Sequence, residues 1–180
     1  MIWFIIAVLI CLYGIKKQFS LTFILAKSGS NYTSKVFYLT APSTGTKNLV
    51  VTFSGSQNFS LSWINLYGVD QTSPIPTTYS TVNQLSAPGT TISPVINVAN
   101  STSRVLELIM GGEVVDLVLA YDSSQTSLVS SWGNIAYKDP GATGNLNMDW
   151  RNRRSSYDMV SILLEVKEAS NATGNFLQLF

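Results

Sequence analysis

The chain is a succession of short segments rich in β-branched and aromatic residues, and this pattern limits its fold more than any other feature. The clearest segments are residues 104–110, 113–121 and 157–166, and turn residues separate the predicted strands. No helical periodicity of useful length appears after Lys17. The pattern predicts an all-β fold of eight to ten short strands, arranged as an antiparallel β-sandwich of the jelly-roll or immunoglobulin-like type.

Other parts of the chain are less regular. Residues 70–95 contain four prolines and predict loop or edge structure, because proline cannot donate to a strand ladder. Residues 138–156 predict a polar loop. Phe59, Leu61 and Trp63 alternate with serines, but the alternation slips after Trp63, which predicts a β-bulge there. Further strands are predicted at residues 35–40, 49–53, 59–67, 96–98, 128–137 and 176–180.

The first fifteen residues carry no charged side chain, and Lys16 and Lys17 follow directly. The run is short for a membrane span, which needs roughly 20 apolar residues, although the apolar stretch 21–26 extends it. It predicts an N-terminal hydrophobic anchor or arm over residues 1–26, followed by a β-sandwich domain over residues 27–180. The two lysines favour a cytoplasmic side for that domain, and an ordinary signal peptide with a weak basic region is the alternative. The predicted anchor residues are Ile2, Trp3, Phe4, Ile5, Ile6, Val8, Leu9, Ile10, Leu12, Lys16 and Lys17.

Charge is scarce and unevenly distributed along the chain. Only 12% of the residues are charged, against about 25% in ordinary soluble domains. Such a composition is typical of extracellular, filament and virion proteins, whose neighbours cover much of the surface. Residues 1–69 contain five lysines and no acidic residue, which predicts contact with anionic lipid headgroups. A dilute, solvated face is the alternative.

Composition excludes several kinds of chemistry. The chain has no histidine and one cysteine, Cys11, so histidine-based catalytic triads, thiolate or imidazole metal sites and an internal disulfide are impossible. No phosphate-cradling or dinucleotide-binding glycine motif occurs. The net charge of +1 gives no nucleic-acid signal. The sequence predicts a protein that is not an enzyme, with no cofactor, no small-molecule substrate and no direct nucleic-acid binding.

Residues 111–112 are a diglycine between two alternating apolar segments, a pattern that predicts a tight β-hairpin. In that hairpin Leu106 faces Leu117 and Leu108 faces Val115, on the face that lines the core. The opposite face is also apolar, and we expect a neighbouring subunit to cover it in an assembly. The residues of this predicted subunit interface are Val105, Ile109, Val114 and Val118.

Between the apolar pairs of the second face, Glu107 lies opposite Asp116 in the predicted hairpin. Like charges directly across a ladder are destabilising, and four arrangements relieve the repulsion. In the first, a calcium ion bridges the two carboxylates, and in the second, one carboxyl is protonated with a raised pKa. In the third, an arginine neutralises both charges, and in the fourth, the two side chains point apart into solvent. Glu107 and Asp116 are therefore a weak candidate metal site.

A second candidate interface is the segment 149–154, which combines one tryptophan with three arginines. Because Trp and Arg are enriched at interaction hot spots, Trp150, Arg151, Arg153 and Arg154 are predicted to contact another subunit. A solvated loop with internal ion pairs is one alternative, and contact with phosphate is another.

Four Asn-x-Ser/Thr sequons are candidate glycosylation sites, at a frequency close to that expected by chance. A glycan at any of them would indicate an exterior location. The sequons begin at Asn31, Asn58, Asn100 and Asn171.

In strand count and length, residues 35–180 resemble the single jelly-roll capsid proteins of membrane-containing icosahedral viruses, including archaeal ones. The resemblance implies two four-stranded sheets, assembly into capsomers and no catalysis. The predicted function is that of a virion capsid subunit, which assembles with copies of itself and other shell subunits and contacts a membrane through its N-terminus. The alternative is an extracellular archaeal pilus-like filament subunit or surface-anchored adhesion protein. A filament of this kind can form when an extended N-terminal segment completes a neighbour's sheet.

Overall fold

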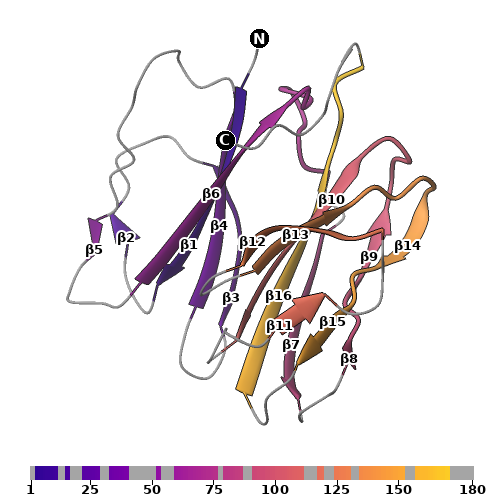
Figure 1. The fold of residues 1–180 in the computed structure, drawn as a ribbon. Helices are drawn as coiled ribbons and strands as arrows, with labels where there is room; N and C mark the ends of the chain where they lie inside the picture. The colour runs from indigo at the N-terminus through magenta and orange to yellow at the C-terminus, as the bar shows by residue number, and fades with distance from the viewer. Residues whose placement is uncertain are drawn as a thin grey trace. The chain divides into compact units, whose positions relative to one another are not determined.

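The computed structural model describes residues 3–11, 15–16, 22–28, 33–40, 52–53, 59–76, 79–86, 91–111, 117–119, 124–130, 134–152 and 157–170. Every regular element within these residues is a β-strand, and every strand pairing is antiparallel (Figure 1). The predicted all-β, antiparallel class is confirmed. The chain forms two compact units, Met1–Gln71 with Ala169–Phe180 and Thr72–Glu168.

The first unit contains a four-stranded sheet. Its strands are β1 (Trp3–Cys11), β3 (Thr22–Ser28), β4 (Thr33–Thr40) and β6 (Phe59–Tyr67), in the order β3-β4-β1-β6. Strand β1 pairs with β4 on one side and with β6 on the other. Val36 of β4 and Ile64 and Leu66 of β6 are buried. The short strands β2 (Ile15–Lys16) and β5 (Thr52–Phe53) pair separately.

The apolar N-terminal segment is thus an extended strand with a neighbour on each side over residues 3–11. The predicted division into an arm at 1–26 and a domain at 27–180 differs from the two compact units. The prediction followed the apolar run, whereas strand pairing joins that run to residues 33–67. Within the described residues, no helix has the length and apolarity needed to cross a membrane. Contact of residues 1–26 with a membrane stays a prediction.

The second unit is built on a five-stranded sheet in the order β12-β13-β10-β16-β7. These strands are β7 (Tyr79–Ser86), β10 (Arg104–Gly111), β12 (Thr126–Ser130), β13 (Asn134–Lys138) and β16 (Tyr157–Val166). The central strand β10 pairs with β13 on one side and β16 on the other. Strand β7, from the proline-rich stretch predicted as loop or edge, lies at one edge of this sheet.

Two smaller sheets complete the second unit. Strand β9 (Val95–Val98) pairs with β14 (Gly144–Asn147). Strand β15 (Trp150–Asn152) lies between β8 (Thr91–Ile92) and β11 (Leu117–Leu119). The segment that precedes and includes β15 supplies two of the buried side chains of the unit, Met148 and Trp150.

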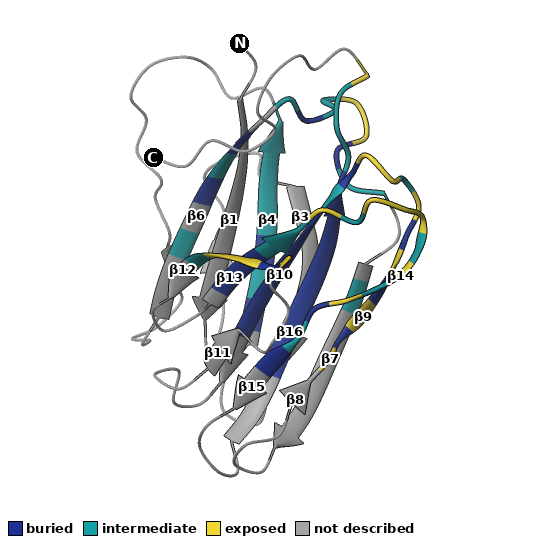
Figure 2. Ribbon diagram, turned by 45° about the vertical axis from the view of Figure 1, so that its right-hand side comes forward, coloured by how far each residue is buried: buried dark blue, intermediate teal, exposed yellow. Residues whose placement is uncertain are grey.

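Both faces of β10 are buried. Residues 105–109 alternate between the two faces, and each of the five is at most 3% exposed (Figure 2). The face of Val105 and Ile109 belongs to a core cluster that joins β10, β13 and β16 to β9 and β15. The members of this core cluster are Ile96, Val98, Val105, Ile109, Ala136, Met148, Trp150 and Leu163, and Leu146 packs against them.

The predicted strands match the structure at some positions and differ at others. The predicted strands 59–67 and 157–166 coincide with β6 and β16. Within the predicted strand 128–137, residues 128–130 belong instead to β12 and residues 134–137 to β13, and these two strands pair with each other. Residues 138–156, predicted as a loop, contain β14 and β15, because the partners of these short strands, β9 and β8, lie far away in the sequence.

Three other local predictions also differ from the structure. Strand β6 pairs with β1 without a register shift, so the bulge predicted after Trp63 is wrong. The predicted strands 49–53 and 113–121 are described only in part, as β5 and β11. Residues 176–180 lie outside the described part of the chain.

Leu163 is fully buried in the core cluster, whereas Val95 on β9 is 39% exposed. We expect Leu163→Ala to lower the free energy of unfolding by about 2 to 5 kcal/mol, because it removes buried methyl groups and leaves a cavity. The control Val95→Ala should cost less than about 1 kcal/mol. Urea unfolding followed by circular dichroism measures both, and equal losses would contradict the position of Leu163 in the core.

Candidate functional site

One carboxyl group lies inside the core of the second unit. Glu107 is in the middle of β10, and its side chain is fully buried on the face that carries Val105 and Ile109. Its neighbours across the ladder are Ala136 of β13 and Leu163 of β16, which are both apolar. An ionised carboxylate is costly to bury without a partner charge, so this position requires a specific chemical explanation.

Two side chains hydrogen-bond to the Glu107 carboxyl. The indole Nε1–H of Trp150 donates to Oε2, and the hydroxyl oxygen of Ser161 lies 2.6 Å from Oε1. Trp150 belongs to β15 and Ser161 to β16. The carboxyl therefore connects the three-stranded sheet to two adjacent strands of the five-stranded sheet. We call Glu107, Trp150 and Ser161 the Glu107 cluster.

Burial controls the protonation of this cluster. Burial raises the pKa of Glu107 to about 8, the hydrogen bonds from Ser161 and Trp150 oppose the rise, and the nearby Asp149 charge adds to it. At neutral pH the carboxyl is therefore mostly protonated. Because an indole N–H is only a donor, Oε2 accepts from Trp150. Oε1 accepts from the Ser161 hydroxyl when the carboxyl is ionised, and in the neutral form the proton on Oε1 can instead donate to the Ser161 oxygen, since a hydroxyl takes either role.

The segment that carries Trp150 is also held by its backbone. The Met148 N–H donates to the carbonyl oxygen of Pro94 at 3.0 Å, and the Asp149 N–H donates to Oε1 of Gln125 at 3.0 Å. Three consecutive residues, 148–150, are thus each bonded to a different part of the second unit. This places the indole of Trp150 against Glu107.

The hairpin predicted across residues 111–112 is not formed. At Glu107, β10 is already paired with β13 on one side and with β16 on the other, so no edge remains for Asp116. Leu117 and Val118 belong to β11, which pairs with β15. The diglycine is a local turn signal, whereas β16 pairs with the whole of β10. Glu107 is buried rather than splayed into solvent, and its raised pKa agrees with the protonated arrangement.

The described residues around Glu107 offer no group of metal ligands. Among the described residues, no three acidic or cysteine side chains gather into a group that can hold a metal ion. Calcium takes six to eight oxygen ligands, and the ladder neighbours of Glu107 are apolar. Asp116, the other residue of the candidate pair, lies outside the described residues.

The predicted interface residues lie partly in the core of the chain itself. Val105 and Ile109 are fully buried within one subunit, and Trp150 is 1% exposed. The second apolar face of β10 is therefore covered by β9 and β15, which the hairpin prediction did not anticipate. A role of the other candidates in an interface stays a prediction, because their side chains lie outside the description: Val114, Val118, Arg151, Arg153 and Arg154.

A second buried carboxyl holds the turn between β9 and β10. Oε2 of Glu165 accepts from the N–H of Ala99 at 2.9 Å, and Oε1 accepts from the N–H of Asn100 at 2.8 Å. Glu165 follows Leu163 by two residues on β16, so it lies on the same face as the core cluster. Its carboxylate fixes the turn through backbone donors.

Asn100, one of the candidate glycosylation residues, lies in this turn. It is half-buried, and the following residues Ser101 and Thr102 are exposed. The backbone N–H and the hydroxyl of Thr102 each lie 3.0 Å from Oδ1 of Asn100. The other sequons lie outside the described residues: Asn31, Asn58 and Asn171.

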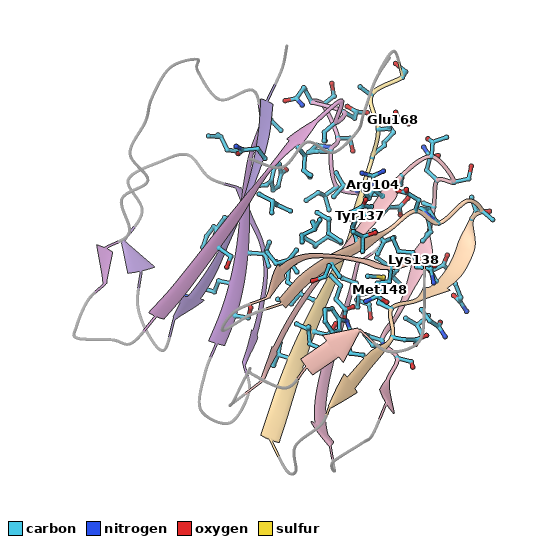
Figure 3. All side chains as sticks on the ribbon, viewed as in Figure 1. Arg104, Tyr137, Lys138, Met148 and Glu168 are labelled. Atoms are coloured by element: carbon cyan, nitrogen blue, oxygen red, sulfur yellow. The ribbon has the colours of Figure 1, made fainter. Side chains whose placement is uncertain are left out.

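Arg104, at one end of β10, is bound by two groups from β13 and the residues after it. Its Nε and Nη2 atoms lie 2.6 Å and 3.1 Å from the two carboxylate oxygens of Asp139. Its guanidinium carbon lies 4.5 Å from the ring centroid of Tyr137. Figure 3 labels both residues, which lie near each other. Since Asp139 is 61% exposed, this ion pair contributes little stability.

Comparisons with protein-family models, with curated proteins and with solved structures found no match for this chain. Function must therefore be argued from the described geometry. The Glu107 cluster is closed to solvent, because Glu107, Trp150 and Ser161 are all buried. A substrate cannot reach it while the core is closed, so its evident role is to hold β15 on the five-stranded sheet.

Sequence reasoning missed Ser161, Glu165 and Arg104. Ser161 and Glu165 had a weak signal, since both are polar residues within the otherwise apolar stretch 159–166. The signal does not identify their partners, because Glu107 lies 54 residues from Ser161 and Ala99 lies 66 residues from Glu165. Only the strand order brings these groups together.

Exchanging Glu107 for a neutral side chain of the same shape tests the protonated arrangement. Glu107→Gln keeps an acceptor for Trp150 and a donor for Ser161, so we expect its free energy of unfolding at pH 7 to equal or exceed that of the wild type. Glu107→Ala should cost about 2 to 5 kcal/mol, because it leaves a cavity and a buried indole N–H without a partner. Urea unfolding measures both variants. Equal destabilisation by the two would argue against a neutral, hydrogen-bonded side chain at this position.

Proposed function

We propose that the chain is a structural protein that assembles with copies of itself, specifically a virion capsid subunit that contacts a membrane through its N-terminal region. The main observation behind the proposal is that buried polar side chains of the second unit bond within the chain. Glu107 and Glu165, both buried, bond to groups of the chain itself and hold short strands and turns in place. This use suits a rigid building block better than a binding cleft.

The core of the second unit supports a β-sandwich for this subunit. The core cluster combines side chains from the five-stranded sheet with side chains from β9 and β15. Side chains of two β-layers that meet in this way form the interior of a sandwich. A jelly roll is the form of sandwich that the resemblance to single jelly-roll capsid proteins implies.

Charge distribution supports the membrane contact. Residues 1–69 contain five lysines and no acidic residue, whereas the rest of the chain contains six basic and ten acidic residues. Lysines near an anionic lipid surface each contribute about 1 kcal/mol of attraction. The low fraction of charged residues, 12%, also suits a protein whose surface is largely covered by other subunits.

One observation favours the alternative, an extracellular filament subunit. The apolar segment Trp3–Cys11 is extended and pairs on both sides, with β4 and with β6. An extended segment of this kind is what a subunit donates when its strand completes the sheet of a neighbour. The form of the native assembly therefore separates the two proposals.

Imaging of the native assembly tests the capsid proposal. We expect closed isometric particles in negative stain, and mass spectrometry of the purified particles should find peptides from residues 1–15. A capsid subunit that uses this segment at an internal membrane has to keep it. Long fibres, or a chain trimmed after residue 15, would favour the exported filament subunit instead.

Binding to lipid vesicles tests the membrane contact separately. The purified chain should co-float with phosphatidylserine-containing vesicles, and Lys16→Glu with Lys17→Glu should weaken binding at least tenfold, because both charges are reversed near the lipid. The matched control, Lys138→Glu with Lys167→Glu, makes the same change of charge in the second unit. Equal weakening by both pairs would point to net charge alone and contradict a specific N-terminal contact.

A further inference from the structure

The Glu107 cluster joins strands of very different strength through one carboxyl group. Glu107 and Ser161 lie on β10 and β16, which pair along the whole of β10. Trp150 lies on β15, a strand of three residues. We propose that Glu107 is a proton-controlled latch: its protonated carboxyl holds β15 on the five-stranded sheet, and loss of the proton releases β15 and opens the core cluster locally.

The weaker strand is the one that gives way. Strand β16 has ten residues and pairs with β10 on one side and β7 on the other. Strand β15 pairs with β11 over three residues and with β8 over two. Segments with few paired residues open at lower free energy than central strands. When the carboxyl ionises, water can therefore reach it most easily by displacement of β15.

The described charged side chains nearest Glu107 do not offer it a counter-ion. Lys138 of β13 and Glu165 of β16 share its face of the sheet, two residues further along their strands. The Lys138 ammonium donates to the carbonyl oxygen of Asn147 at 3.3 Å, and the Glu165 carboxylate accepts from backbone N–H groups of the β9–β10 turn. Neither bonds to the Glu107 carboxyl.

Among the described side chains, the other two elements packed on this face do not supply a cation either. Asp149, directly before β15, is acidic and disfavours a second negative charge at Glu107. The buried side chains of β9, Ile96 and Val98, are uncharged. Among the described side chains, the bonds to the Glu107 carboxyl come from the indole of Trp150 and the hydroxyl of Ser161.

The direction of the effect follows from proton linkage. In the closed form the pKa of Glu107 is about 8, whereas a carboxyl exposed to water has its ordinary value of 4.5. Between these values the closed form binds a proton that the open form does not. The stabilisation of the closed form is complete at acid pH and is lost as the pH rises. The ratio of open to closed molecules should increase about tenfold per pH unit and level off above the higher value.

Hydrogen exchange on the purified full-length chain measures this opening. Exchange is followed by mass spectrometry between about pH 5 and about pH 9.5, a range over which the Glu107 carboxyl changes from protonated to ionised. The measured rates are corrected for base catalysis of the exchange itself. We expect the opening of residues 148–152 to increase close to tenfold per pH unit up to about pH 8. Residues 104–109 and 160–166, in β10 and β16, should keep their protection over the same range.

Glu107→Gln is the control, because its side chain cannot ionise. Its opening at residues 148–152 should not change with pH. The latch would be refuted if the wild type showed no pH dependence, if Glu107→Gln showed the same dependence, or if β10 and β16 lost protection together with β15. The last result would mean that ionisation unfolds the whole unit and releases no single strand.

A direct titration covers the case in which Glu107→Gln fails to fold. Carbon-13 labelling of glutamate carboxyls allows the protonation of Glu107 to be followed by NMR, with Trp150→Phe to assign the signal through the loss of the indole bond. A carboxyl that titrates well above the other glutamates, together with the appearance of the opened β15, supports the latch. A carboxyl that ionises at the ordinary value with the core still closed would refute it.

Discussion

The hydrogen bond between the indole of Trp150 and the carboxyl of Glu107 is the contact on which the core of the second unit depends. It joins a three-residue strand to the centre of a five-stranded sheet, at a point where the neighbours of Glu107 across the ladder are apolar. An apolar residue at position 107 would pack against Leu163 and Ala136, but it would leave the buried indole N–H unsatisfied. The carboxyl is suitable because burial keeps it protonated, and a neutral carboxyl both accepts from Trp150 and donates to Ser161.

Other buried polar side chains of the second unit are also bonded to groups of the chain itself. Glu165 satisfies two backbone N–H groups of the β9–β10 turn, and Gln125 accepts from the backbone before Trp150. Buried polar side chains thus fasten short strands and turns that have little pairing of their own. Sparse surface charge and an interior tied by such bonds are the properties expected of a subunit that is covered by its neighbours, which is the basis of the proposed role in a virion shell.

The candidate site shows which of its features a local sequence pattern can predict and which it cannot. The pattern around residues 105–118 drew attention to Glu107 and to a protonated carboxyl as one of four arrangements. It assigned the wrong partner, because a diglycine is a local signal and gives no weight to the long strand β16, which occupies one edge of β10. Trp150 was also singled out, as an anchor for another subunit, and it proves to be an anchor within the chain. In both cases the residue type identified an important position but did not identify its partner.

The sequence by itself determined the all-β class, the position of the long strands β6, β10 and β16, and the exclusion of histidine-based triads and an internal disulfide, because these depend on local alternation and composition. Only the tertiary structure decided the order of the strands, the existence of β14 and β15, and the burial of Glu107 against Trp150 of β15. The physical reason is that a short strand has no stability alone. Its pairing and the environment of its side chains come from residues that are distant in the sequence, and a local pattern carries no information about them.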